Sequence, residues 1–170
     1  IPAPPTSSQS ANVNLKDSVI GGDVKITQNN AEDIATAMVQ ALERIGFSSH
    51  SSPAELTASQ EAEVEQVLEM SEQLANHGIE IDPWTEITLG NAAKLAGRTH
   101  SAQQHYLCAL ETFRKNGDRG GEADSLNGLG NIAETRGDLA EAERLYRESL
   151  AIKREIGEQQ GEAASLNNLG

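Results

Sequence analysis

The strongest constraint on the fold is an internal repeat in the C-terminal half of the chain. The last ten residues, GEAASLNNLG (161–170), match GEADSLNGLG (121–130) at eight positions, forty residues apart. The same offset pairs Leu89, Gly90, Asn91, Ala93, Gly97, Ala102, Tyr106 and Leu110 with Leu129, Gly130, Asn131, Ala133, Gly137, Ala142, Tyr146 and Leu150. A period of roughly 20 to 50 residues is typical of stacked units, none of which buries its apolar face without a neighbour. We therefore expect a repeat array.

Each repeat unit has the pattern of two helices joined by a short turn. Apolar or small residues form two stripes with helical spacing. Leu126, Leu129, Gly130 and Ala133 lie at i, i+3, i+4 and i+7, and Ala142, Tyr146, Ser149 and Leu150 lie at i, i+4, i+7 and i+8. Between the stripes, Gly137 can end the first helix in the left-handed region and Asp138 can cap the second. The unit is thus predicted to be two antiparallel helices. Gly130 and Ala142 would allow close approach, and Tyr146 would pack on the neighbouring unit.

At these residues the chain resembles tetratricopeptide repeat proteins, which carry Leu-Gly in the first helix, Gly-Asp at the turn, and Ala followed by an aromatic residue in the second helix. The forty-residue period and the wording Leu-Asn-x-Leu-Gly-Asn make it most similar to repeats of the kinesin light chain type. The resemblance covers residues 84–170. It implies a mainly α fold, an α-solenoid of helix hairpins, with two full repeats and the start of a third in residues 83–170. Glu86 replaces Leu126 and Arg98 replaces Asp138 in the first unit, so we expect it to be the divergent end repeat.

The N-terminal region has a different pattern. Residues 1–10 contain three prolines and three serines and are predicted to be a flexible tail. Residues 11–28 read as a β-hairpin around Gly21 and Gly22. Its apolar face would hold Val13, Leu15, Val19, Val24 and Ile26. A lone hairpin is marginal in water, so either the next helix or a second copy of the chain should cover it. Our hypothesis is that this face oligomerises the protein.

Two helices are predicted between the hairpin and the repeats, in residues 31–78, as an N-terminal cap of the array. The first would run from 31 to 45, with Asn30 as its N-cap and Gly46 as its stop. The second would open at Ser52 and Pro53 and end near residue 76. Its apolar stripe should pack on the first repeat.

Composition narrows the classes of function. The formal net charge is −13, from 13 Lys and Arg against 26 Asp and Glu, and the cations are interspersed with Glu, which disfavours nucleic acid as a partner. No apolar run is long enough to span a bilayer, no signal-peptide pattern appears, and a single cysteine allows no intrachain disulfide. These features predict a cytoplasmic protein with no membrane partner.

No catalytic, metal or cofactor site is predicted. His100 and His105 are five residues apart, which places them on different helix faces, and the four histidines are interpreted as solvated surface residues. Cys108 has no obvious neighbour that would lower its pKa. The segment Gly117 to Gly121 lacks the Lys-Ser/Thr of a phosphate-binding loop and is interpreted as a turn. We therefore expect that the protein is not an enzyme and needs no cofactor.

The candidate site is the concave face of the array, which the first helix of each unit lines in such proteins. The polar residues predicted to face it, and to bind a partner, are Asn91, Asp124, Asn127, Asn131, Glu134 and Asn167. Asparagine presents a donor and an acceptor, so a row of them can pair with the backbone of an extended peptide. The resemblance to kinesin light chain repeats implies that role for Asn91, Asn127, Asn131 and Asn167. The alternative is that Asn127 and Asn131 only bridge neighbouring helices.

Three functions remain open at this point. The first is a protein-interaction scaffold that binds a partner peptide or protein on the concave face and self-associates through its N-terminal β segment. The second is a sensor or regulatory arm of a larger signalling protein. The third is a structural self-assembly module in which repeats of different copies stack on one another.

Overall fold

The computed structural model describes residues 28–48, 50–158 and 168, and most of these residues are helical. It contains six helices: α2 (Gln28–Ile45), α3 (Ala58–Asn76), α4 (Pro83–Leu95), α5 (Thr99–Asn116), α6 (Arg119–Thr135) and α7 (Leu139–Glu155). Extended pairing among the described residues is limited to a single bridge between Ser48 and Ser51. The β-hairpin predicted for residues 11–28 lies outside the described residues except for Gln28, and Gln28 is helical.

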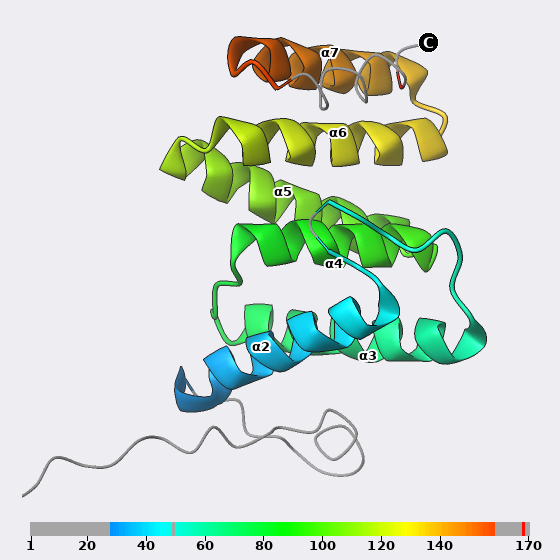
Figure 1. The fold of residues 1–170 in the computed structure, drawn as a ribbon, viewed down its shortest axis with the longest axis vertical. Helices are drawn as coiled ribbons and strands as arrows, with labels where there is room; N and C mark the ends of the chain where they lie inside the picture. The colour runs from blue at the N-terminus through cyan, green and yellow to red at the C-terminus, as the bar shows by residue number, and fades with distance from the viewer. Residues whose placement is uncertain (1–27, 49, 159–167, 169–170) are drawn as a thin grey trace, which may run out of the picture.

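The helices stack along one axis in chain order, as Figure 1 shows. The hairpin α4–α5 packs on the hairpin α6–α7 through contacts between α5 and α6, and α2 and α3 pack on each other and on α4. One buried apolar cluster runs through all six helices. The predicted α-solenoid of helix hairpins is therefore confirmed for the described repeats.

The turns inside the hairpins form as the repeat pattern predicts. Gly97 and Gly137, forty residues apart, have φ values of 74° and 78°, a region that glycine enters without steric cost. The Asp138 carboxylate then accepts a hydrogen bond from the backbone N of Glu141 at 3.2 Å, which caps α7. Arg98 stands at the corresponding position of the first unit, and α5 has no side-chain cap there. The departure seen in the sequence thus removes one cap.

The recurring glycines are required by tyrosine rings that lie against them. A Cβ atom added at Gly130 would lie 2.4 Å from the ring of Tyr146, and one at Gly90 would lie 2.7 Å from the ring of Tyr106. Tyr106 also lies against Gly128 of the next hairpin, where the added Cβ would approach to 2.6 Å. The predicted contact of the tyrosine with a neighbouring unit is thus seen for Tyr106. For Tyr146 the contact that the structure shows is with Gly130 of its own hairpin.

Three predicted boundaries are wrong. Helix α2 begins at Gln28, so Asn30 lies inside it rather than capping it. Helix α3 begins at Ala58 rather than at Pro53, because Thr57 and Gln60 form a capping box in which each side chain bonds the other's backbone N–H. Only Gly117 of the predicted glycine turn is a turn residue, with φ of 72°, since residues 119–121 belong to α6. The predicted ends of both N-terminal helices, at residues 45 and 76, are confirmed.

Candidate protein-interaction face

The first helices of the two repeats share one face of the molecule, because α4 contacts α6 directly. Asp124, Asn127 and Asn131 lie at i, i+3 and i+7 of α6 and are half-buried. Trp84 and Asn91 of α4 stand forty residues before Asp124 and Asn131, and they are also half-buried. We call the surface formed by these five residues the α4–α6 face. Glu134 is exposed at the end of the same helix, and Asn167 lies outside the described residues.

A tyrosine–asparagine pair recurs in both hairpins on this face. The Tyr106 hydroxyl donates to Asn91 Oδ1 at 2.8 Å, and the Tyr146 hydroxyl donates to Asn131 Oδ1 at the same distance. Both rings are buried, and burial raises the pKa of each hydroxyl, so each stays protonated and able to donate. The pairing fixes the orientation of each amide and leaves its Nδ2 pointing away from the tyrosine.

Tyr146 has a second acceptor that Tyr106 lacks. Its hydroxyl also lies 2.9 Å from Glu134 Oε2, and this carboxylate contributes, after burial, to the raised pKa of Tyr146. A hydroxyl has one hydrogen, so it serves one acceptor at a time. The corresponding residue of the first repeat is Lys94, which accepts no such bond.

A buried lysine, which the sequence analysis did not single out, satisfies Asp124. Lys153 of α7 is 3% exposed, and its Nζ donates to Asp124 Oδ1 and Glu158 Oε2, each at 2.7 Å. Burial lowers the pKa of Lys153, but the hydrogen bonds to Asp124 and Glu158 together outweigh the effect of burial. The net shift of the pKa is upward, so the ammonium stays charged. Asp124 is therefore already paired within the chain.

Asn127 also has a partner inside the chain. Its Oδ1 accepts a hydrogen bond from Nδ2 of Asn168 at 3.0 Å. The structure thus brings Asn91, Asp124, Asn127, Asn131 and Glu134 to one side of the array and gives each of them an intrachain contact. Such contacts are what the bridging alternative expects, and contact of these residues with a partner stays a prediction.

The family comparison agrees with this geometry. The family model of the tetratricopeptide repeat matches residues 81–155, the stretch that forms the two stacked hairpins. Residues 81–155 are thus similar to tetratricopeptide repeats, and we call them the tetratricopeptide segment. A comparison with curated proteins gave no match. Tetratricopeptide repeats are non-catalytic and generally mediate protein–protein interaction.

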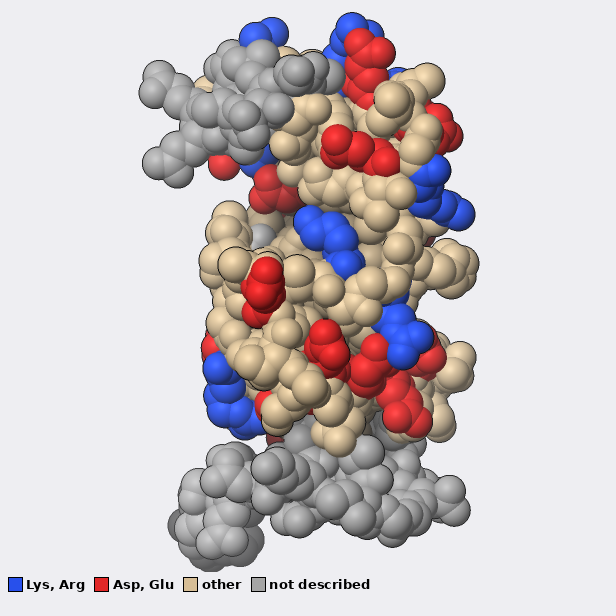
Figure 2. All heavy atoms as spheres, turned by 90° about the vertical axis from the view of Figure 1, so that its right-hand side faces the viewer, with Lys and Arg blue, Asp and Glu red and all other residues tan. Residues whose placement is uncertain are grey.

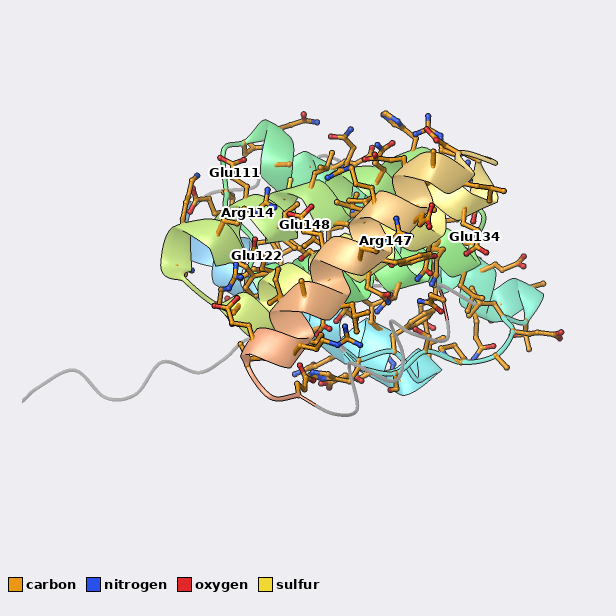
Figure 3. All side chains as sticks on the ribbon, turned by 90° about the horizontal axis from the view of Figure 1, so that it is seen from above. Glu111, Arg114, Glu122, Glu134, Arg147 and Glu148 are labelled. Atoms are coloured by element: carbon orange, nitrogen blue, oxygen red, sulfur yellow. The ribbon has the colours of Figure 1, made fainter. Side chains whose placement is uncertain are left out.

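Ion pairs tie the two hairpins of the tetratricopeptide segment together on the side near α5 and α7. Arg114 Nε bonds Glu122 Oε1 at 2.9 Å and Arg114 Nη2 bonds Glu148 Oε1 at 2.9 Å, so one guanidinium links α5, α6 and α7 (Figure 3). Glu122 also pairs with Arg119. Burial raises the pKa of Glu122, but its hydrogen bonds from Arg114 and Arg119 outweigh burial, and the net shift is downward. The carboxylate stays ionised as the hub of this network.

A cavity of about 640 Å³ lies beside these ion pairs, between α5 and α7 and over α6. Leu110, Leu126 and Leu129 form part of its apolar lining, and Leu107 is 42% exposed at its edge. Its rim carries both cations and anions. Figure 2 likewise shows acidic and basic side chains interspersed over the face that it displays, where no continuous basic stripe appears.

The interpretation of His105 as a solvated surface residue is wrong. It is 9% exposed, and its Nδ1 lies 2.6 Å from Oε2 of Glu86, while its Nε2 lies 3.5 Å from the hydroxyl of Ser71. The Ser71 hydroxyl is 1% exposed and donates to the Leu68 carbonyl at 2.7 Å, so it has neither a substrate path nor a proton directed at the imidazole. The three side chains link α3, α4 and α5 rather than forming a hydrolase triad.

No other reactive centre emerges from the described part of the chain. Cys108 is an exposed residue. Desolvation of its thiol raises the pKa most, and the negative charges of Glu86 and Glu111 raise it further, so the thiol stays protonated at neutral pH. Within residues 28–48 and 50–158, no three His, Cys, Asp or Glu side chains are grouped so that they could hold a metal ion. None of the helices in that part combines the length and apolar character of a membrane span.

Proposed function

We propose that this chain is a non-enzymatic protein-interaction module that binds an extended segment of a partner protein on the α4–α6 face. The observation that carries the proposal is the Tyr–Asn pair, which recurs forty residues apart within a tetratricopeptide segment. Because Oδ1 of Asn91 and of Asn131 accepts from a tyrosine, the Nδ2 hydrogens of both are directed toward other acceptors. Backbone carbonyls of an extended peptide are such acceptors.

The spacing of the repeats supports the same proposal. The forty-residue period and the Leu-Asn-x-Leu-Gly-Asn pattern of residues 126–131 are typical of kinesin light chain repeats, and we assign the two hairpins to that type. Self-association through Val13, Leu15, Val19, Val24 and Ile26 is part of the proposal on the sequence pattern alone. If it occurs, several weak faces on one particle would bind a multivalent partner more tightly than one face does.

A random peptide library tests the proposal, because the selection does not require the natural partner to be identified. Random dodecapeptides displayed on phage are selected on the wild-type chain, and the selected peptides are titrated against a variant with Asn127→Ala and Asn131→Ala. The Tyr146 hydroxyl keeps Glu134 as an acceptor in this variant. We therefore expect helicity and melting to change little while peptide binding is lost. Asn116→Ala, at the exposed end of α5, is the matched control and should bind as the wild type does.

Two results would contradict this assignment. Unfolding of the double variant would show that Asn127 and Asn131 are structural bridges. Unchanged binding by a folded double variant would show that the selected peptides bind elsewhere, and the cavity between α5 and α7 would then be the next surface to test.

A further inference from the structure

Trp84 and Asp124 occupy equivalent positions of the two repeats on the α4–α6 face, and they differ in chemistry. The second repeat places Asp124 against Lys153 in an ion pair of 2.7 Å. The first repeat has Trp84 and Phe113 at the corresponding positions, with ring centroids 4.8 Å apart in an edge-to-face arrangement. Phe113 is buried and Trp84 is half-buried. The first repeat therefore presents an aromatic surface where the second presents a satisfied ion pair.

The connection between α2 and α3 lies on this aromatic surface. We call its described residues, 46–48 and 50–57, the strap. Figure 1 shows the strap crossing α4, and the ring of His50 lies 5.4 Å from that of Trp84, tilted by 31°. Phe47 is 1% exposed, and its backbone N donates to the Leu42 carbonyl at 2.9 Å, which anchors the start of the strap to α2.

The strap is much longer than an antiparallel helix pair requires. The connections inside the two hairpins are short, since they comprise only residues 96–98 and 136–138. This length lies at the short end of the usual range for connections in helical bundles. Beyond Phe47, the strap forms a small turn with its own bonds, Ser48 N to the Ser51 carbonyl and Ser48 Oγ to Ser51 Oγ, both at 2.8 Å. His50 itself is exposed. Most of the strap after the turn is exposed too, so it has few buried contacts to hold it in place.

We propose that the strap is an internal occupant of the aromatic end of the α4–α6 face, and that a partner segment displaces it by placing an aromatic or apolar side chain on Trp84. The proposal rests on the proposed function and adds the kind of residue that the partner brings. It divides the face into two parts. The α6 part offers the amide groups of Asn127 and Asn131 to a peptide backbone, because Asp124 is already paired with Lys153. The α4 part offers the aromatic surface of Trp84 to one side chain.

Displacement of the strap has a measurable effect on affinity. A segment that binds only when the strap is open has an apparent dissociation constant equal to the intrinsic value divided by the open fraction. A strap that is closed in about 90% of molecules therefore weakens binding about tenfold. Loosening the strap should recover that factor.

The first measurement uses Trp84, which is the only tryptophan in the chain. Its fluorescence is quenched with acrylamide in the full chain, in His50→Ala and in His100→Ala. His100 is exposed on α5 and serves as the matched control. We expect stronger quenching and red-shifted emission for His50→Ala alone, with unchanged helicity in both variants. Equal quenching in all three chains would show that the strap does not shield Trp84 and would overturn the proposal.

The second measurement uses phage-selected dodecapeptides. Peptides selected on the wild-type chain, and a second set selected on His50→Ala, are titrated against both chains and against His100→Ala. We expect peptides that protect Trp84 from acrylamide to carry an aromatic or large apolar residue and to bind His50→Ala about tenfold more tightly than the other two chains. Peptides that protect Trp84 but bind all three chains equally would overturn the strap and leave the proposed function standing. Failure to select any peptide on either chain would count against the proposed function, and the quenching comparison would still decide whether the strap covers Trp84.

Discussion

Two adjacent glycines in the first turn of α6 should respond in opposite ways to the same substitution. Gly120 and Gly121 are both helical and neither has a positive φ. A Cβ added at Gly121 would lie 2.4 Å from Cδ1 and Cε1 of Phe113, whereas one at Gly120 would meet only Asp118 Oδ1, at 3.5 Å. Gly121→Ala should therefore destabilise the protein, and Gly120→Ala should stabilise it.

The size of the effect follows from two opposing contributions. Carbon atoms in van der Waals contact are about 3.5 to 4.0 Å apart, so the ring of Phe113 would have to move by about 1 Å. Phe113 is 1% exposed, and Trp84 lies against it, so little free space is available. Overpacking of this kind costs up to about 3 kcal/mol, while the better helix propensity of alanine returns about 1 kcal/mol. We expect Gly121→Ala to lose about 2 kcal/mol and Gly120→Ala to gain up to about 1 kcal/mol.

Thermal and urea unfolding followed by far-ultraviolet circular dichroism measures both values. For a chain of this length, 1 kcal/mol corresponds to a Tm change of about 2 to 4 °C. Gly121→Ala should thus melt about 4 to 8 °C below the wild type and Gly120→Ala slightly above it. Equal melting of the two variants would refute the claim that the ring of Phe113 sets the identity of residue 121.

Two further predictions concern hydrogen bonds. Asn91→Ala should lower the free energy of unfolding by about 1 kcal/mol, because it removes the acceptor of the Tyr106 hydroxyl. Asn131→Ala should lower it by only about a few tenths of a kcal/mol, because Glu134 still accepts from Tyr146. Urea unfolding of both variants measures the difference, and equal losses would contradict it. The pKa of Glu122 is lower in the folded chain than in the unfolded one, so its ion pairs stabilise the fold fully above the unfolded value of about 4.3 and are lost as the pH falls through the folded value. Glu122→Gln should reduce the unfolding free energy at pH 7 and flatten its decline in acid, and a pH series of urea midpoints that stayed parallel to the wild type would speak against this role.

Local chemistry and periodicity were enough to predict the repeat part of the fold. The forty-residue offset located the hairpins, and a glycine followed by an aspartate located the turn at Gly137 and Asp138, because both signals act through the backbone of neighbouring residues. The start of α3 was missed for a related reason. Two cap signals stood five residues apart, and the reciprocal bonds of Thr57 and Gln60 prevailed over the proline at residue 53.

Partners that meet only in the folded chain were not predicted. Glu86 and His105 are 19 residues apart in sequence, and Ser71 is 34 residues from His105, so no local pattern joins them. Glu86 replaces a buried leucine of the second repeat, and it is tolerated at 8% exposure because the imidazole of His105 satisfies it. Lys153 was missed in the same way, since its buried ammonium depends on Asp124 of another helix.

The residues that recur between the repeats and those that differ have separate roles on the α4–α6 face. Asn91 and Asn131 recur and bond tyrosines in the same way, so any contact that they make with a peptide backbone is the same in both repeats and independent of the partner's sequence. Trp84 and Asp124 occupy equivalent positions but differ in chemistry, and Asp124 is already neutralised by Lys153. Discrimination among partners requires a difference in binding free energy between them, which the recurring amides do not supply. Selectivity on this face should therefore come from Trp84. The two repeats differ at this position, and His50, the residue of this chain that lies against Trp84, is exposed.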